Sequence, residues 1–423
     1  MYMDKISKGV NFCCYKTDKF KTMNLSFSFI SPLSEKASLD SLIIHLLSRT
    51  CAKYPTILEM NRKLASLYGA TITPSVSKSG DSLVLKLTLT AVEDRFALGN
   101  ESILKEAVDL LCNLVFRPSV TPDGFLENDV EREKRLLIEK IESEKDDKRL
   151  YALQRMTEEM CKNETYGLPK YGTEEKIKEA TAKDIFERWL RLVVNCPVQI
   201  TYVGGGDTEL IKNTVLSYFE QIQRKAVWPI KTEFIVDAFE QKEIKETQKV
   251  KQGKLVIGYR AGMSYDRDNF PAVKLMSMIF GGGTFSKLFT NVREKMSLCY
   301  YCAARLNAAK GVITVESGVE TEKAESALEA IRNELDEVRK GNFSDETIQN
   351  AKLSFRDALK NVYDSTSAIA EWLMGYTLSS VFYTPEELSE LINEVSREEI
   401  IVAANMVSED TVYLLQAEKE ENR

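Results

Sequence analysis

The hydrophobic and polar positions along the chain change their period several times, and each change predicts an element. Residues 23–31 alternate apolar and polar side chains with a period of two, as a half-buried strand does. Over residues 38–49, leucines and isoleucines cover most of the circumference of a helix, so this helix is predicted to be buried. A capping box from Thr56 to Glu59 opens a second helix, which ends at Gly69.

The second half of the chain repeats the order of elements in the first half. In the first half, strands are predicted at 70–76, 82–91 and 197–203, and helices at 125–147, 149–161, 174–179 and 182–192. In the second half, strands are predicted at 254–259, 298–306, 311–318 and 411–416, and helices at 269–280, 285–296, 322–340, 345–360, 366–380, 385–394 and 397–406. Landmarks such as Leu67 and Leu298, or Leu83 and Val312, recur at similar offsets. A gene duplication explains this repetition.

The duplication predicts a fold class and domain boundaries. Antiparallel strands followed by long helices give an α+β sandwich in each half. We place an N-terminal domain at residues 1–222 and a C-terminal domain at 251–423. A linker over 223–250, rich in Lys, Glu and Gln, joins them and could contain a strand near 233–237. The length of 423 residues agrees with two domains, because single cores stop growing beyond about 250–300 residues.

Composition excludes several classes of function. The 57 Lys and Arg residues against 64 Asp and Glu residues give a net charge of −7, which argues against a nucleic-acid-binding surface. No run of about 18 apolar residues occurs, and residues 1–20 lack the apolar core of a signal peptide, so neither a membrane span nor secretion is predicted. The eight cysteines are scattered through predicted helices and strands, which is typical of buried, reduced thiols in a cytoplasmic protein.

The chain has a single histidine, His45, which excludes any metal centre that needs two or three histidines from this chain alone. Cys299 and Cys302 have the spacing of a metal or redox pair, but one such pair is a weak signal. On a regular strand their side chains point to opposite faces, so they could act together only if a bulge intervened. Cys13 and Cys14 are more simply interpreted as neighbours in a strand.

Four segments carry a resemblance to a known family. They are Leu67-Tyr-Gly-Ala70, Glu131–Ile141, Tyr166–Glu175, and Gly281-Gly-Gly-Thr-Phe-Ser-Lys-Leu-Phe-Thr-Asn-Val-Arg-Glu-Lys295 with its continuation to Tyr300. Together with the order of the elements, they resemble the insulinase/pitrilysin family of metallopeptidases over nearly the whole chain. The resemblance implies two insulinase-like domains, each an antiparallel-rich sheet covered by helices, that form a clamshell.

Active members of that family carry H-x-x-E-H on the first buried helix, where two histidines bind zinc and the glutamate is the general base. The matching stretch here keeps His45 but has Ser48 at the base position and Arg49 at the second ligand. The third ligand, a glutamate seven residues after Glu133, is Lys140. The neighbouring Glu139 would point about 100° away around the helix. We therefore expect a degenerate site without metal, in which Arg49 and Lys140 pair with nearby carboxylates.

In the second half, the resemblance assigns substrate binding to Arg293 and Tyr300, which can donate hydrogen bonds to a peptide carbonyl. The plainer alternative is an arginine that caps its helix and a tyrosine within a strand. Gly281, Gly282 and Gly283 could let a peptide or partner backbone approach closely, or could simply end a buried helix.

Some relatives in this family work as pairs, in which a zinc-less subunit completes the peptide chamber of a zinc-bearing one. The resemblance therefore predicts a non-catalytic subunit of a heterodimeric peptidase, with no cofactor of its own, a zinc-bearing homologue as partner and an unfolded peptide as substrate. Two alternatives stay open: a stand-alone zinc endopeptidase with relocated ligands, and a structural scaffold without a peptidase role.

Overall fold

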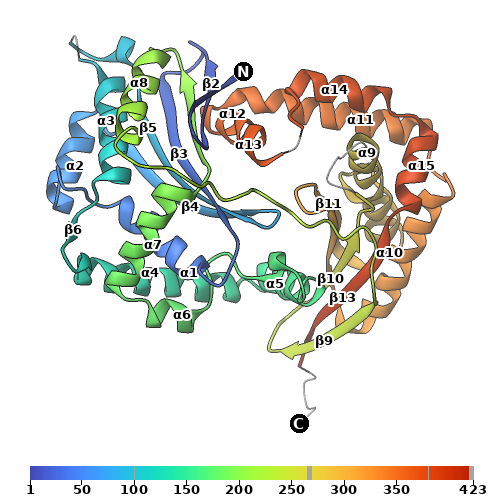
Figure 1. Ribbon diagram of the computed structural model, residues 1–423. Coiled ribbons are helices and arrows are strands. Elements are labelled where there is room, and N and C mark those ends of the chain that lie inside the picture. Colours follow the sequence, from blue (N-terminus) through green and yellow to red (C-terminus); the bar gives the residue numbers. More distant parts are fainter. Residues whose placement is uncertain (100, 264–268, 380, 419–423) are drawn as a thin grey trace. The chain divides into compact units, whose positions relative to one another are not determined.

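The computed structural model describes residues 1–99, 101–263, 269–379 and 381–418, and the chain forms two compact units (Figure 1). Unit 1 consists of Met1–Ile141, Leu168–Lys231 and Asn361–Phe382. Unit 2 consists of Glu142–Gly167, Thr232–Lys360 and Tyr383–Arg423. Each unit thus includes a segment from the other half of the sequence, which the contiguous domains predicted at 1–222 and 251–423 do not.

Unit 1 is built on a six-stranded sheet in the order β1-β2-β8-β3-β5-β4. Its neighbouring strands are antiparallel except for β2 and β8, which are parallel. Along β5, every second residue from Leu83 to Leu89 is a buried leucine, because this face packs on helices. The strands are β1 (Tyr2–Ser7), β2 (Val10–Lys16), β3 (Thr22–Pro32), β4 (Thr71–Ser79), β5 (Ser82–Val92) and β8 (Val198–Gly204).

The helices of unit 1 include the capped helix that the sequence predicts, and Thr56 and Glu59 form the expected capping box. The helices are α1 (Ala37–Leu47), α2 (Ile57–Ser66), α3 (Ile103–Phe116), α4 (Glu127–Asp146), α6 (Glu174–Glu179), α7 (Ala182–Asn195) and α8 (Thr208–Phe219). The last residues of α4, from Glu142 onward, belong to unit 2. Two short strands, β6 (Val120–Thr121) and β7 (Gly124–Phe125), form a separate ladder.

Unit 2 has a five-stranded sheet in the order β11-β12-β10-β13-β9. This order matches β4-β5-β3-β8-β2 of unit 1 strand for strand, and the one parallel pair, β13 with β9, falls at the same place. The strands are β9 (Lys242–Gln248), β10 (Gly253–Arg260), β11 (Cys299–Asn307), β12 (Val312–Val319) and β13 (Ser408–Ala417). The repeated order is the one that a gene duplication predicts, and the predicted α+β class is confirmed.

Helices again cover the sheet of unit 2, and none of the described helices is long and apolar enough to cross a membrane. They are α9 (Phe270–Gly281), a π-helix (Leu288–Lys295), α10 (Ala324–Arg339), α11 (Asp345–Lys360), α14 (Pro385–Glu394) and α15 (Arg397–Asn405). The strand considered near 233–237 is absent from that described stretch; the segment pairs only from Lys242 onward, as β9.

The two units exchange one helical segment each. Helix α5 (Lys148–Met160) follows α4 in the sequence but packs on β10 and β13 of unit 2, where Met156 and Met160 lie against Gly258. A Cβ at Gly258 would come within 2.6 Å of both methionine sulfurs, so glycine permits this close packing. In the reverse direction, α12 (Thr366–Leu373) packs on β8 and β3 of unit 1. It is followed by α13 (Gly375–Leu378), and residue 380 of the predicted helix lies outside the described residues.

The exchanged helix α12 explains why β3 is more buried than its alternation predicts. Asn24, Ser26 and Ser28 occupy the polar positions of the strand, yet each is at most 2% exposed. Because α12 covers this second face of the sheet, the prediction of a half-buried strand is wrong: β3 is buried on both faces.

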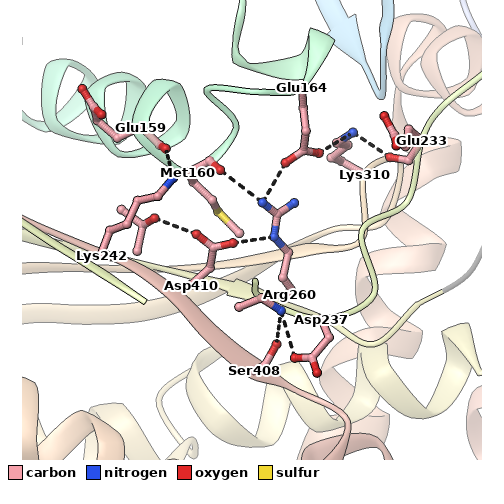
Figure 2. Close-up of polar contacts among 12 residues, drawn as sticks. Glu159, Met160, Glu164, Glu233, Asp237, Lys242, Arg260, Lys310, Ser408 and Asp410 are labelled. Carbon is pink, nitrogen blue, oxygen red and sulfur yellow. Dashed lines mark hydrogen bonds and ion pairs between the residues drawn. The ribbon is translucent and has the colours of Figure 1, made fainter. Parts of the chain in front are cut away.

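A buried network of charges attaches the segment after α5 to the sheet of unit 2 (Figure 2). Arg260 on β10 donates to Glu164 at 2.7 Å and to Asp410 on β13 at 2.8 Å. Lys310, which is fully buried, lies 2.9 Å from the other oxygen of Glu164. Two cations and two carboxylates thus balance one another out of contact with solvent.

Candidate functional site

His45 lies in the last turn of α1, and the helix itself orients its ring. The imidazole Nδ1 is 2.7 Å from the Ser41 carbonyl oxygen, which can only accept, so Nδ1 carries the proton and Nε2 keeps its lone pair. Burial lowers the pKa of His45; the Ser41 carbonyl and Glu133 oppose this shift, whereas Lys140 and Arg49 add to it. The imidazole is therefore neutral at pH 7.

The positions of the base and the second ligand lie past the end of α1. Ser48 follows the last helical residue and donates its hydroxyl to the His45 carbonyl at 2.6 Å. The Nε of Arg49 lies 3.0 Å from a carboxylate oxygen of Glu133 on α4, whose side chain is only 1% exposed. Arg132 approaches the same oxygen at 3.4 Å. The expected pairing of Arg49 with a carboxylate is thus confirmed.

The position of the third ligand is occupied by an ammonium group that faces an aromatic ring. Lys140 Nζ lies 5.0 Å from the centre of the Tyr171 ring, instead of pairing with a carboxylate as expected. Glu139, the slipped alternative, lies 3.7 Å from Arg135 on an exposed face of α4.

Zinc does not fit this set of side chains. Arg49 and Lys140 both bring positive charge close enough to affect the titration of His45, and neither has a lone pair to donate at neutral pH. Among the residues that the structure describes, no group of three or more His, Cys, Asp or Glu side chains could hold a metal ion.

In unit 2, Arg293 and Tyr300 lie in one pocket of about 380 Å³. Arg293 is on the π-helix, where its guanidinium stacks 4.5 Å from the centre of the Phe289 ring. Tyr300 is on β11 and is 61% exposed, and its hydroxyl lies 3.3 Å from Glu320. The structure therefore brings together the two residues that the sequence paired, with their donor groups accessible.

A tight turn joins the two elements that carry this pair. Ser297 adopts φ +52°, a conformation uncommon for a residue with a side chain, and the chain then enters β11. A short connection with a tight turn thus separates Arg293 from Tyr300.

The three glycines lie at the end of α9 and have different surroundings. Gly281 is buried, and a Cβ there would fall 2.5 Å from the backbone nitrogen of Ala304, so this glycine lets α9 pack on β11. Gly282 caps the helix and is exposed, and Gly283 is half-buried. The helix-ending interpretation fits Gly281 and Gly282, while contact with a peptide stays a prediction.

A β-bulge at Tyr300 changes the interpretation of the cysteine pair. Opposite β12, Cys299 pairs with Val319 and Cys302 pairs with Ser317, while the register shifts between Cys299 and Tyr301. Residues 317 and 319 share a face, so Cys299 and Cys302 share it too. A regular strand would place the two cysteines on opposite faces, and the intervening bulge that the sequence prediction left open as the exception is present.

The chain is similar to a known family model and to curated proteins. Residues 197–355 match the family model described as the peptidase M16 inactive domain. The probable inactive metalloprotease YmfF of Bacillus subtilis is 31% identical over 401 residues, which cover 95% of this chain and 94% of that protein. The chain belongs to the insulinase-type M16 metallopeptidase family. Within it, the chain is a homologue of the inactive type.

Another curated protein and two solved structures are similar to this chain over much of its length. An uncharacterised zinc protease of B. subtilis, YmxG, is 23% identical over 266 residues, 62% of each chain. The crystal structure of a conserved protein from Enterococcus faecalis superposes with a TM-score of 0.88 at 26% identity, over 100% of this chain and 99% of that one. A peptidase M16 inactive domain from Pseudomonas fluorescens, at 16% identity and a TM-score of 0.78 over 100% and 99% of the chains, shares the fold.

Proposed function

We propose that this M16 homologue is the non-catalytic subunit of a heterodimeric insulinase-like metallopeptidase. The observation that carries the proposal is the accessible pocket shared by Arg293 and Tyr300 in a chain whose own metal positions hold Arg49 and Lys140. Donor groups lie where a substrate carbonyl could reach them, while cations occupy the positions that match the second and third zinc ligands. The zinc would come from a zinc-bearing homologue that forms the other part of the peptide chamber.

Arg293 and Tyr300 would act on the scissile peptide group. A guanidinium and a phenol are both donors, and donors fixed around a carbonyl oxygen stabilise the negative charge that develops there. The Tyr300 hydroxyl is at the long end of hydrogen-bond range from Glu320, at 3.3 Å, so a substrate oxygen could replace this partner at low cost.

Strand addition would hold the peptide. Strand β11 is at the edge of its sheet and β4 at the edge of the other, and an edge strand offers backbone groups to an extended, unfolded peptide. Because these bonds involve the backbone, they select for extended conformation more than for sequence.

We also propose a cytoplasmic location, since all eight cysteines are free thiols.

The test is reconstitution with a zinc-bearing M16 homologue from the same genome. The full chain alone should purify without stoichiometric zinc and leave a quenched-fluorescence peptide of unfolded sequence uncleaved, whereas the mixed pair should cleave it in a chelator-sensitive way. Stoichiometric zinc in the chain alone, or cleavage by it, would overturn the proposal in favour of the stand-alone peptidase.

Substitutions in the pocket separate a catalytic subunit from a scaffold. Tyr300→Phe and Arg293→Ala should each lower the kcat of the pair by roughly 10²-fold, the size expected for loss of one oxyanion donor. Arg305→Ala, on an exposed position of the same strand, is the matched control and should have little effect. If the Arg293 and Tyr300 variants retain full activity in the pair, the protein is a scaffold.

A further inference from the structure

Cys299 differs from the other seven cysteines of the chain. Those seven are buried, whereas Cys299 is partly exposed and lines the same pocket as Arg293. A thiol that solvent can reach is open to chemistry that buried thiols are not.

The bulge at Tyr300 gives this thiol a second cysteine on its own face of the sheet. Cys302 lies next along that face and is only 4% exposed, whereas Cys299 is partly exposed. One accessible thiol with one sheltered thiol beside it is the arrangement in which the first reacts with an external partner and the second resolves the product.

Ser317 completes this cluster from the neighbouring strand. It stands directly opposite Cys302, is 1% exposed, and its hydroxyl has no hydrogen-bond partner among the described residues. A buried hydroxyl without a partner is costly, and a thiolate on this face would accept its hydrogen bond. The strand pairing thus supplies a donor for a negatively charged sulfur.

The surroundings of the two sulfurs give the two thiols different pKa values. The Cys302 thiol, followed by Ser317 and the positive charge of Arg293, lowers the pKa of Cys299 to about 7, against the opposing effect of burial. The neighbouring Cys299 and burial raise the pKa of Cys302 well above its ordinary value. Near neutral pH, much of Cys299 is therefore thiolate while Cys302 keeps its proton.

We propose that Cys299 and Cys302 form a redox-active dithiol, with Cys299 as the nucleophile and Cys302 as the resolving thiol, whose oxidant is a low-molecular-weight disulfide. The Cys299 thiolate attacks one sulfur of the disulfide, forming a mixed disulfide and expelling one thiolate. Cys302 then loses its proton and attacks the Cys299 sulfur, which expels the second thiolate. The chain loses two electrons and two protons, and the external disulfide becomes two thiols.

This inference goes beyond the proposed function and does not depend on it, because its readouts are chemical. The reduced full chain is incubated with glutathione disulfide at pH 7. Free thiols counted after unfolding should fall from eight to six, with no glutathione retained. The tryptic peptide 296–305, which contains both cysteines, should lose two hydrogens.

The two single variants assign the roles. Cys302→Ser should trap one glutathione on Cys299, and Cys299→Ser should react with none. Iodoacetamide should alkylate Cys299 of the native protein at a rate that is half-maximal near pH 7. If Cys302→Ser does not fold, the tryptic peptide of the wild type still decides the question. Retained glutathione on the wild type, a half-maximal rate near the ordinary thiol pKa, or faster reaction of any other cysteine would overturn the proposal.

Discussion

His45 has the ring orientation of a metal ligand, but cations occupy the positions of the other two ligands. Its Nδ1 donates to the Ser41 carbonyl, as the outer nitrogen of a metal-bound histidine usually does to a carbonyl or carboxylate, and this leaves Nε2 available. Being the only histidine, it also gives a single imidazole signal that needs no assignment.

We expect that signal to titrate below the ordinary value of 6.5, since burial disfavours the charged ring. The unfolded chain then binds a proton at a higher pH than the folded chain, so this contribution to stability is complete above pH 6.5 and is lost as the pH falls below it. Proton NMR across pH 4–8 measures the midpoint, and urea unfolding of His45→Gln should show less loss of stability between pH 6.5 and 5. A midpoint at or above 6.5 would contradict the buried, neutral ring.

Replacing the two cations at the ligand positions by ligand residues should create a metal-binding site. Arg49→His combined with Lys140→Glu replaces both cations by ligand types around His45, and the helix α1 needs to extend by only half a turn to present position 49. We expect about one zinc per chain by elemental analysis after dialysis, against none for the parent. The same double variant with His45→Ala is the control, and equal zinc in both would show that the metal binds elsewhere.

The sequence alone predicts that the metal site is degenerate, because the residue types at the ligand positions show cations in place of ligands. Arg49 and Lys140 are the two cations at these positions. The sequence shows the spacing of the cysteine pair but not its shared face, because the face that a residue takes after a bulge depends on pairing with β12.

At the scale of elements, the strongest periodic patterns gave strands and helices close to those observed, as for β5 and the capped α2. Helices α3 and α8 are not among the elements predicted from the sequence, although the exposed Lys105 and Glu106 mark a polar side of α3. The exchange of α5 was equally hidden, since its amphipathic pattern shows that one face is buried but not which sheet buries it.

The network at the end of α5 should respond strongly to the loss of one carboxylate. Glu164→Gln removes a carboxylate that pairs with both Arg260 and Lys310, and both cations stay buried. We therefore expect a loss of about 3–5 kcal/mol in the free energy of unfolding by urea denaturation. Glu158→Gln, which breaks a more exposed pair with Arg155 on the same helix, is the control and should cost about 1 kcal/mol or less.

The same variant should change the acid stability of unit 2. Burial raises the pKa of Glu164, but the hydrogen bonds from Arg260 and Lys310 outweigh it and leave the pKa below its ordinary 4.5. The stabilisation is therefore present above pH 4.5 and is lost as the pH falls below it, and Glu164→Gln should remove this part of the acid dependence. If the variant and the parent lose stability equally in acid, Glu164 does not cause this part of the acid dependence.

For the whole molecule, the exchange of segments makes each half of the chain incomplete. A fragment of residues 1–231 lacks α12, which covers Cys13 and Val203 on its sheet. A fragment of residues 232–423 lacks α5, whose methionines pack on β10. The break between 231 and 232 falls in a stretch without helix or strand, so it removes no element by itself.

We therefore expect neither fragment to fold alone and the two to assemble when they are expressed together. Separately, each should expose apolar surface, bind the dye ANS and unfold without a cooperative transition; together they should co-purify at one-to-one stoichiometry and melt cooperatively. Placing residues 361–382 after the first fragment through a flexible linker is the sharper control, because it should rescue the first fragment alone. Two independently folded fragments with sharp melting transitions would show that the exchanged helices are dispensable, and that each sheet is stable with only one face covered.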